Sequence, residues 1–200
     1  MADSQTRAPI RVAVVDDNPV RSAIVVDGLR EAGVTELVVI PTTASLVRRL
    51  VEAAPDVIVI GLANPSRDML EQMFQVSRVV SRPVAMFVDR SDEDTIRAAI
   101  EAGVSAYVVD GLKKERVKTI VDMAISRFAA FDRLQRELEA ARSELQAHKT
   151  VDRAKAILMR VRDLSEEEAY TLLRQTAMRE RRKLADVAAS LITASALLEK

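Results

Sequence analysis

The sequence predicts an α/β domain built on a parallel sheet, followed by a smaller all-helical domain. Two observations indicate the α/β domain: short runs of β-branched residues lack polar alternation, and stretches with helical periodicity separate them. A third observation indicates the helical domain, because neither Gly nor Pro occurs from Lys113 to the end of the chain. The 200 residues leave room for one domain of ordinary size and one smaller domain.

Strands and helices are expected to alternate from Arg11 onward. The expected strands are Arg11–Val15, Glu36–Ile40, Val57–Leu62, Pro83–Val88 and Ala106–Val109. The expected helices between them are Pro19–Ala32, Ser45–Ala54, Asp68–Ser77 and Asp92–Ala102. Five such units over residues 11–115 make a flavodoxin-like fold, in which functional groups gather at the carboxyl ends of the strands.

The helix that begins near Lys113 presents a core-facing stripe and then a second apolar stripe. The second stripe advances in steps of three and four residues through Phe131, Leu134, Leu138, Ala141 and Leu145. Charged residues lie between these positions, a pattern typical of a short dimeric coiled coil. Packing of this stripe against the chain's own α/β domain is the alternative. His148, the only histidine, comes next in the series, and we interpret it as a seam residue of the helix.

The last part of the chain is expected to form three helices. The first continues through Val161, and Ser165 with Glu168 three residues later is a capping box that starts the second. The predicted core positions of the three helices are Val151, Ala154, Ile157, Leu158, Val161, Ala169, Leu172, Leu173, Thr176, Leu184, Val187, Ala188, Leu191 and Ile192.

Composition and motifs exclude several classes of protein. The chain is 48% apolar and 30% charged, with zero net charge and no cysteine, as expected for a soluble folded protein without a disulfide framework. No apolar run approaches the roughly 18 residues that span a bilayer, and the first residues do not read as a signal peptide, so we expect a cytoplasmic protein. With one histidine and no G-x-G-x-x-G, P-loop or H-E-x-x-H motif, we expect no enzyme and no catalytic residues.

Two adjacent carboxylates, Asp16 and Asp17, follow the first strand. Paired carboxylates at the carboxyl end of a strand suit a hard divalent cation such as Mg²⁺. Residues 11–130 resemble the receiver domains of two-component response regulators, in which an aspartate at the end of the third strand takes a phosphoryl group. Gly61 holds that place here, and glycine offers no nucleophile.

Two further positions depart from the receiver pattern. Val88 or Asp89 stands where the family has Ser or Thr, and Asp110 stands where it has a lysine. The resemblance therefore implies a pseudo-receiver, with Gly61 as a degenerate phosphoacceptor position and with Asp16 and Asp17 as a vestigial acidic pocket. Weak Mg²⁺ binding at those two aspartates is the one cofactor that we consider; no other metal or cofactor is expected.

The carboxyl-terminal part resembles the ANTAR module, a three-helix RNA-binding domain of transcription antiterminators. The matching residues are Ala154-Lys155, Leu158-Met159, Ser165 through Tyr170, Leu173-Arg174, Ala177-Met178, Leu184 and Val187-Ala188. A receiver-like domain, a helical linker and ANTAR together describe the AmiR/NasT group. The stretches Asn64–Met73 and Gly103–Leu112 are most similar to the NasT-type regulators of nitrate assimilation.

The resemblance implies a function and partners. Members of the group bind leader mRNA that carries two hairpins in tandem, and so prevent a terminator from forming. The resemblance also implies a homodimer and a nitrate/nitrite-sensing regulatory protein that restrains the regulator, so that phosphorylation at the usual aspartate is dispensable.

Six residues are candidates for RNA contact under this resemblance: Lys155, Met159, Arg162, Tyr170, Arg174 and Met178. Unpaired RNA bases stack on aromatic rings and guanidinium planes, and the last three residues recur every four positions of one helix. Periodicity alone favours Tyr170 as a half-buried packing residue and the methionines as gap fillers. The family resemblance favours the RNA role.

Two alternative functions stay open. A DNA-binding response regulator is one, because Leu184–Ile192 resembles the first helix of a helix-turn-helix motif; however, only eight residues follow Ile192, too few for a turn and a recognition helix. A phosphorylation-independent adaptor for other proteins is the second. The expected organisation is a disordered tail (1–10), the receiver-like domain (11–115), its last helix extended into a coiled-coil linker (116–148), and ANTAR (149–200).

Overall fold

The computed structural model describes residues 9–41, 44–110 and 112–198, so most of the tail predicted for residues 1–10 lies outside the described residues. The chain divides into two compact units, Met1–Asp132 and Arg133–Lys200. Each unit has its own hydrophobic core. Among the described residues, no helix is long and apolar enough to cross a membrane.

The first unit is the predicted α/β fold. Its strands are β1 (Arg11–Val15), β2 (Glu36–Ile40), β3 (Val57–Leu62), β4 (Val84–Val88) and β5 (Ala106–Val109). They form one parallel sheet in the order β2-β1-β3-β4-β5. The helices between them are α1 (Pro19–Glu31), α2 (Leu46–Ala53), α3 (Arg67–Val80) and α4 (Glu93–Glu101). This strand order confirms the flavodoxin-like class.

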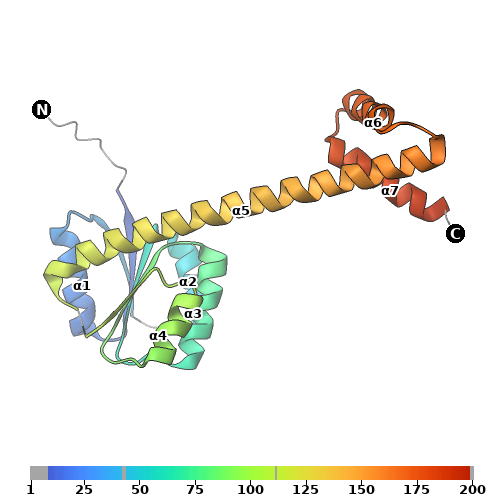
Figure 1. Ribbon diagram of the computed structural model, residues 1–200. Coiled ribbons are helices and arrows are strands. Elements are labelled where there is room, and N and C mark those ends of the chain that lie inside the picture. Colours follow the sequence, from blue (N-terminus) through green and yellow to red (C-terminus); the bar gives the residue numbers. More distant parts are fainter. Residues whose placement is uncertain (1–8, 42–43, 111, 199–200) are drawn as a thin grey trace, which may run out of the picture. The chain divides into compact units, whose positions relative to one another are not determined.

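Both faces of the sheet are covered, which explains why the central strands read as continuous apolar runs. Figure 1 shows α1 and the start of α5 on one face and α2, α3 and α4 on the other. Successive residues of β1 point to opposite faces, so Val14 packs with Leu29 of α1 while Val15 packs with Leu50 of α2. Full burial of each such aliphatic side chain contributes about 1.5–3 kcal/mol.

The second unit is helical. Helix α5 (Lys114–Arg162) runs for 49 residues and belongs to both units, and α6 (Glu166–Glu180) and α7 (Leu184–Leu198) follow it. The last turns of α5 pack with α6 and α7 (Figure 1). Their common core consists of Val151, Ala154, Leu158, Ala169, Leu173, Ala177, Val187 and Ala188. Each of these residues except Ala177 is a predicted core position, whereas Val161, also predicted for the core, is 67% exposed.

Candidate nucleic-acid interface and acidic pocket

The acidic pocket of the first unit contains a buried arginine. Asp16, directly after β1, is only 3% exposed, and Arg21 on α1 is 7% exposed. Arg21 Nε donates to Asp16 Oδ2 at 2.8 Å and Arg21 Nη2 donates to Asp16 Oδ1 at 2.9 Å. This fork of two parallel bonds is the strong geometry of a guanidinium on a carboxylate. The hydrogen bond to Asp16 raises the pKa of Arg21, which therefore stays charged.

Arg21 also reaches across the sheet edge. Its Nη1 donates to Asp89 Oδ2 at 2.9 Å, and its Nη2 lies 3.5 Å from Asp17 Oδ1. Asp89 follows β4, so one guanidinium joins the carboxyl ends of β1 and β4. The side chains of Asp17 and Asp89 face solvent for most of their surface, so only the bond to Asp16 is fully buried. Sequence reasoning missed Arg21, because an arginine in the first turn of an exposed-looking helix gives no sign of burial.

Gly61 leaves the space in which this ion pair lies. Gly61 is buried in β3, the central strand, opposite Phe87 of β4. A β-carbon at this position would overlap Asp16 Oδ2, and it would lie 2.7 Å from Asp16 Cγ and 3.0 Å from Arg21 Nε. A glycine inside a strand often marks such a close approach. The glycine at this position thus admits the Asp16–Arg21 pair.

A second side-chain hydrogen bond holds the loop that carries Asp89. The hydroxyl groups of Ser91 and Tyr107 lie 2.8 Å apart in a hydrogen bond, which joins this loop to β5. Burial raises the pKa of the half-buried Tyr107 phenol, so the ring is neutral at physiological pH. Asp110, which replaces the lysine of the receiver pattern, is exposed after β5 in a left-handed conformation, with φ of 46°.

The pocket does not fit a divalent metal. Both oxygens of Asp16 already accept from Arg21, and Oδ1 also accepts from the Asn18 backbone at 2.8 Å. Gly61 supplies no ligand. Across the described ranges, no three His, Cys, Asp or Glu side chains gather to hold an ion. The weak Mg²⁺ site considered for Asp16 and Asp17 is therefore inconsistent with the hydrogen bonding of Asp16.

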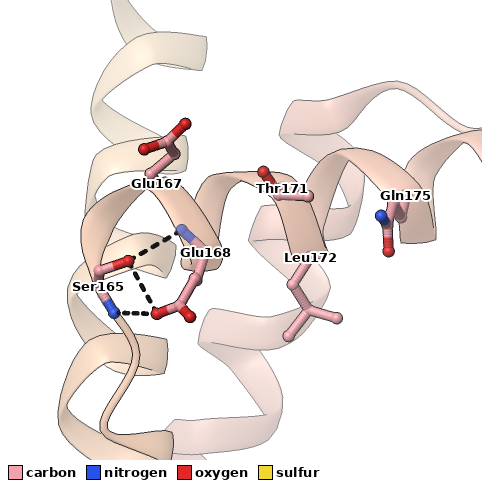
Figure 2. Close-up of a pocket in the computed structure, with 6 residues that line it drawn as sticks. All are labelled: Ser165, Glu167, Glu168, Thr171, Leu172 and Gln175. Carbon is pink, nitrogen blue, oxygen red and sulfur yellow. Dashed lines mark hydrogen bonds between the residues drawn. The ribbon is translucent and has the colours of Figure 1, made fainter.

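In the second unit, α6 starts with the predicted capping box. The backbone N–H of Glu168 donates to Ser165 Oγ at 3.3 Å, and the backbone N–H of Ser165 donates to Glu168 Oε2 at 2.9 Å (Figure 2). This hydrogen bond from the Ser165 backbone lowers the pKa of Glu168. An open groove of about 540 Å³ runs from this cap along α6 to Gln175. Two carboxylates, Glu167 and Glu168, line it, so it does not suit a polyanion.

The predicted RNA contacts on α6 form a row on another flank of the helix. Tyr170, Arg174 and Met178 are all exposed, and the exposed fractions of Tyr170 and Met178 are 42% and 70%. The core stripe is instead Ala169, Leu173 and Ala177, each one residue earlier. At about 100° per residue, this spacing turns the row away from the core. At 42% exposed, Tyr170 is also consistent with the half-buried packing residue that periodicity alone favoured.

Of the predicted contacts on α5, Lys155 differs from the other two. Its Nζ lies 2.7 Å from Asp152 Oδ1 and 2.7 Å from Glu166 Oε1, and its side chain is only 16% exposed. These two carboxylates raise the pKa of Lys155 to about 12. Met159 and Arg162 are exposed. Lys155 would have to leave both ion pairs to reach RNA, whereas Met159 and Arg162 would not.

A group of cations near the end of α6 was not among the predicted contacts. Residues 178–183 carry four cations and one acid, a balance of +3, whereas the first turn of α6 carries three glutamates. Arg182 is held by Glu180 and by Ser190. In the part of the chain that the structure describes, Arg179, Arg181 and Lys183 are exposed and have no ion-pair partner. Helical periodicity in the sequence could not predict this group, because Arg181, Arg182 and Lys183 lie in the turn between α6 and α7.

The predicted coiled-coil stripe is exposed on the single chain. Phe131, Leu134, Leu138 and Leu145 all expose more than two-fifths of their surface. Ala141 is exposed as well. At the other end of the unit, α7 continues as one helix from Leu184 to Leu198. Within the described residues, α7 continues past Ile192 without a turn, so the stretch that resembled the start of a helix-turn-helix motif is part of one helix.

Comparison with solved structures defines the class of the first unit. The signal receiver domain of a modulated diguanylate cyclase from Desulfovibrio desulfuricans superposes with a TM-score of 0.53 at 18% identity, over 60% of this chain and 97% of that one. A CheY-like receiver domain protein from Methanospirillum hungatei gives 0.53 at 12% identity, with the same two coverages. The first unit has the fold of a response-regulator receiver.

Sequence comparison finds a family match within the second unit. Residues 139–192 match the ANTAR domain family. The transcriptional regulatory protein PdtaR of Mycobacterium tuberculosis is 25% identical over 190 residues, which cover 93% of this chain and 91% of the relative. Both findings support a place for this chain among regulators that combine a receiver-like domain with ANTAR.

Proposed function

We propose that the protein is an RNA-binding regulator of transcription antitermination that acts in the cytoplasm. The match of residues 139–192 to ANTAR carries this proposal. The exposed row Tyr170, Arg174 and Met178 supports it, because an aromatic ring, a guanidinium and a flexible thioether side by side suit the faces and edges of unpaired bases. The RNA is a leader mRNA with two hairpins, whose stabilisation keeps a terminator from forming.

The charges of α6 indicate how RNA would lie on it. The acidic first turn repels phosphates, and the cations from Arg179 to Lys183 attract them. The row leads from Tyr170 through Met178 into this basic turn. We therefore place the loop bases on the row and the adjoining phosphates at Arg179, Arg181 and Lys183. Opposite charges at the two helix ends also favour the helix itself, so the cations serve stability as well as binding.

A parallel homodimer would present two such surfaces to two hairpins. With Phe131, Leu138 and Leu145 at a positions, residues 137 and 144 fall at g and residues 142 and 149 at e. A parallel pair then brings Glu137 beside Arg142 and Glu144 beside Lys149 of the other copy. An antiparallel pair would place like charges together. The exposed stripe and these charges support the dimer, and tethering raises the effective concentration of the second reading surface.

Control by a partner protein is the form of regulation that suits the first unit. Gly61 cannot take a phosphoryl group, and Arg21 already neutralises Asp16. A protein that senses nitrate or nitrite and sequesters the regulator is the partner that the NasT-type resemblance suggests.

Direct binding to RNA tests the proposal. The full chain is titrated against a two-hairpin leader RNA and against duplex DNA of the same sequence, without a phosphodonor. RNA-selective binding that Arg174→Ala weakens about tenfold is the expected result. Arg153→Ala is the matched control, because Arg153 is also exposed in the second unit but lies outside the row. Equal affinity for DNA, or equal effects of the two substitutions, would reject the proposal.

A charge exchange tests the dimer. Glu137→Arg or Arg142→Glu alone places like charges together and should weaken self-association measured by sedimentation, by a few tenths of a kcal/mol up to about 1 kcal/mol per pair. The double exchange should restore it. A monomeric wild-type chain at high concentration, or single variants that associate as well as the wild type, would contradict the parallel coiled coil.

A further inference from the structure

The acidic pocket keeps part of the arrangement in which receiver domains gather carboxylates. The oxygens of its buried carboxylate, however, already accept hydrogen bonds. Asp16 and Asp17 follow β1 and Asp89 follows β4, so three carboxylates stand at the carboxyl edge of the sheet. Carboxylates so placed need a cation, because one of them, on Asp16, is buried. A divalent metal does not fit, since the Asp16 oxygens are already bonded and position 61 has no side chain.

We propose that Arg21 is the resident cation of this pocket and permanently takes the place of a metal ion. Its guanidinium contacts all three carboxylates, at 2.8 and 2.9 Å to Asp16, 2.9 Å to Asp89 and 3.5 Å to Asp17. A planar fork with five donors can bridge several carboxylates at once, which the ammonium of lysine does less well. The side chain is covalently part of the chain, so unlike a metal ion it cannot be exchanged or withdrawn.

Gly61 and Arg21 depend on each other in this arrangement. The guanidinium meets Asp16 where a β-carbon at position 61 would lie, so any larger residue there displaces the Asp16 carboxylate. In turn, without Arg21, Asp16 would be a buried charge with no ion-pair partner, left with the hydrogen bond from the Asn18 backbone N–H. The two residues are energetically coupled, so the effect on stability of substituting one should depend on which residue occupies the other position.

We therefore expect the carboxyl edge of the sheet to keep one conformation. Arg21 joins α1 to the ends of β1 and β4, and the Ser91–Tyr107 hydrogen bond joins the loop after β4 to β5. Neither contact involves an exchangeable ion. The receiver-like unit should therefore ignore both divalent cations and phosphodonors. This inference does not depend on RNA binding and would survive a failure of the proposed function.

Thermal melting of the full chain with and without millimolar Mg²⁺, at matched ionic strength, tests the proposal. The wild-type Tm should not respond to Mg²⁺. Arg21→Gln should lower the Tm of the first unit by about 10 °C, because it leaves the buried Asp16 carboxylate without a compensating positive charge. The freed carboxylates should then accept Mg²⁺, which should restore part of that loss. Arg48→Gln, which removes an exposed ion pair with Glu52, should change the Tm by no more than about 2 °C.

Two results would overturn the inference. One is a wild-type chain that Mg²⁺ stabilises, or that binds Mn²⁺ by electron paramagnetic resonance, since the pocket would then hold a metal beside Arg21. The other is an Arg21→Gln variant with the wild-type Tm. If Arg21→Gln fails to fold, Arg21→Lys keeps the charge but loses the bridging fork, and its Tm should lie below that of the wild type. The Mn²⁺ measurement on the wild type needs no variant.

Discussion

The pocket behind Asp16 and the exposed row on α6 both depend on an arginine, and the two arginines are in opposite circumstances. Arg21 is buried and bonded to three carboxylates, whereas Arg174 is exposed and has no ion-pair partner within the described residues. The pocket around Asp16 satisfies its buried charge internally. The second unit leaves cations available at the end of α6.

This difference shows which charges contribute to stability and which remain available for binding. A buried pair costs desolvation and holds the fold in one arrangement, and breaking it by removing one partner is severe. An exposed cation adds little to stability and can bind an anionic partner without first leaving another contact. Lys155 is intermediate between the buried Arg21 and the exposed Arg174, because it is partly exposed but paired with Asp152 and Glu166.

The largest effect is expected from Gly61→Ala. The added β-carbon overlaps Asp16 Oδ2, so the carboxylate must move and its bonds to Arg21 must lengthen. We expect a loss of about 3 kcal/mol in the free energy of unfolding of the first unit, measured by chemical denaturation. The second unit should unfold as in the wild type.

Gly33→Ala is the control for this change. Gly33 has a φ of 86° and open space around it, so alanine there meets backbone strain alone, at roughly 1 kcal/mol. Equal costs at the two glycines would show that the Asp16–Arg21 pair does not require Gly61.

An intermediate effect is expected from Tyr170→Ala on the exposed row. The side chain lies outside the core and is 42% exposed, so its loss should lower the Tm of the second unit much less than the loss of a core residue would. Loss of one stacked base should weaken affinity for the leader RNA about tenfold, measured by fluorescence anisotropy. Tyr170→Phe keeps the stacking surface and should bind as well as the wild type. A large fall in Tm for Tyr170→Ala would mean that Tyr170 belongs to the core after all.

The smallest effect concerns the pH dependence of the capping box. The pKa of Glu168 is lower in the folded chain than its ordinary value of 4.5, because the Ser165 backbone donates to the carboxylate. This contact therefore stabilises the fold fully above about pH 4.5, and it is lost as the pH falls through the lowered pKa. Glu168→Gln should flatten the decline in Tm of the second unit as the pH falls below about 4.5. An identical pH profile for wild type and variant would show that the cap does not depend on the charge of Glu168.

Much of the fold could be predicted from the sequence, because the signals were local. The five β-branched runs coincide with the five strands to within a residue, and the capping box at Ser165 marks the start of α6. The core of the second unit follows the spacing of Val151, Ala154 and Leu158. Such patterns depend only on neighbours in the chain and on burial of one face.

The acidic pocket could be predicted only in part, because its decisive contact is not local. Asp16, Asp17 and Gly61 were found from their places at the ends of strands. That Arg21 turns inward depends on the space beside Gly61, 40 residues away in the sequence, and on Asp89 at the end of another strand. Similarly, the family resemblance that suggested Lys155 as an RNA contact carried no information on its ion pair with Glu166 of the next helix.

The close approach at Gly61 has an evolutionary consequence. Two of the four glycine codons become aspartate codons by a single-base change. Such a change at position 61 introduces a side chain into space that the Asp16–Arg21 pair fills. Replacing Arg21 first instead removes the ion pair of the buried Asp16. Either order of the two substitutions therefore passes through an intermediate with a less stable first unit, so Gly61 and Arg21 should be retained or exchanged together.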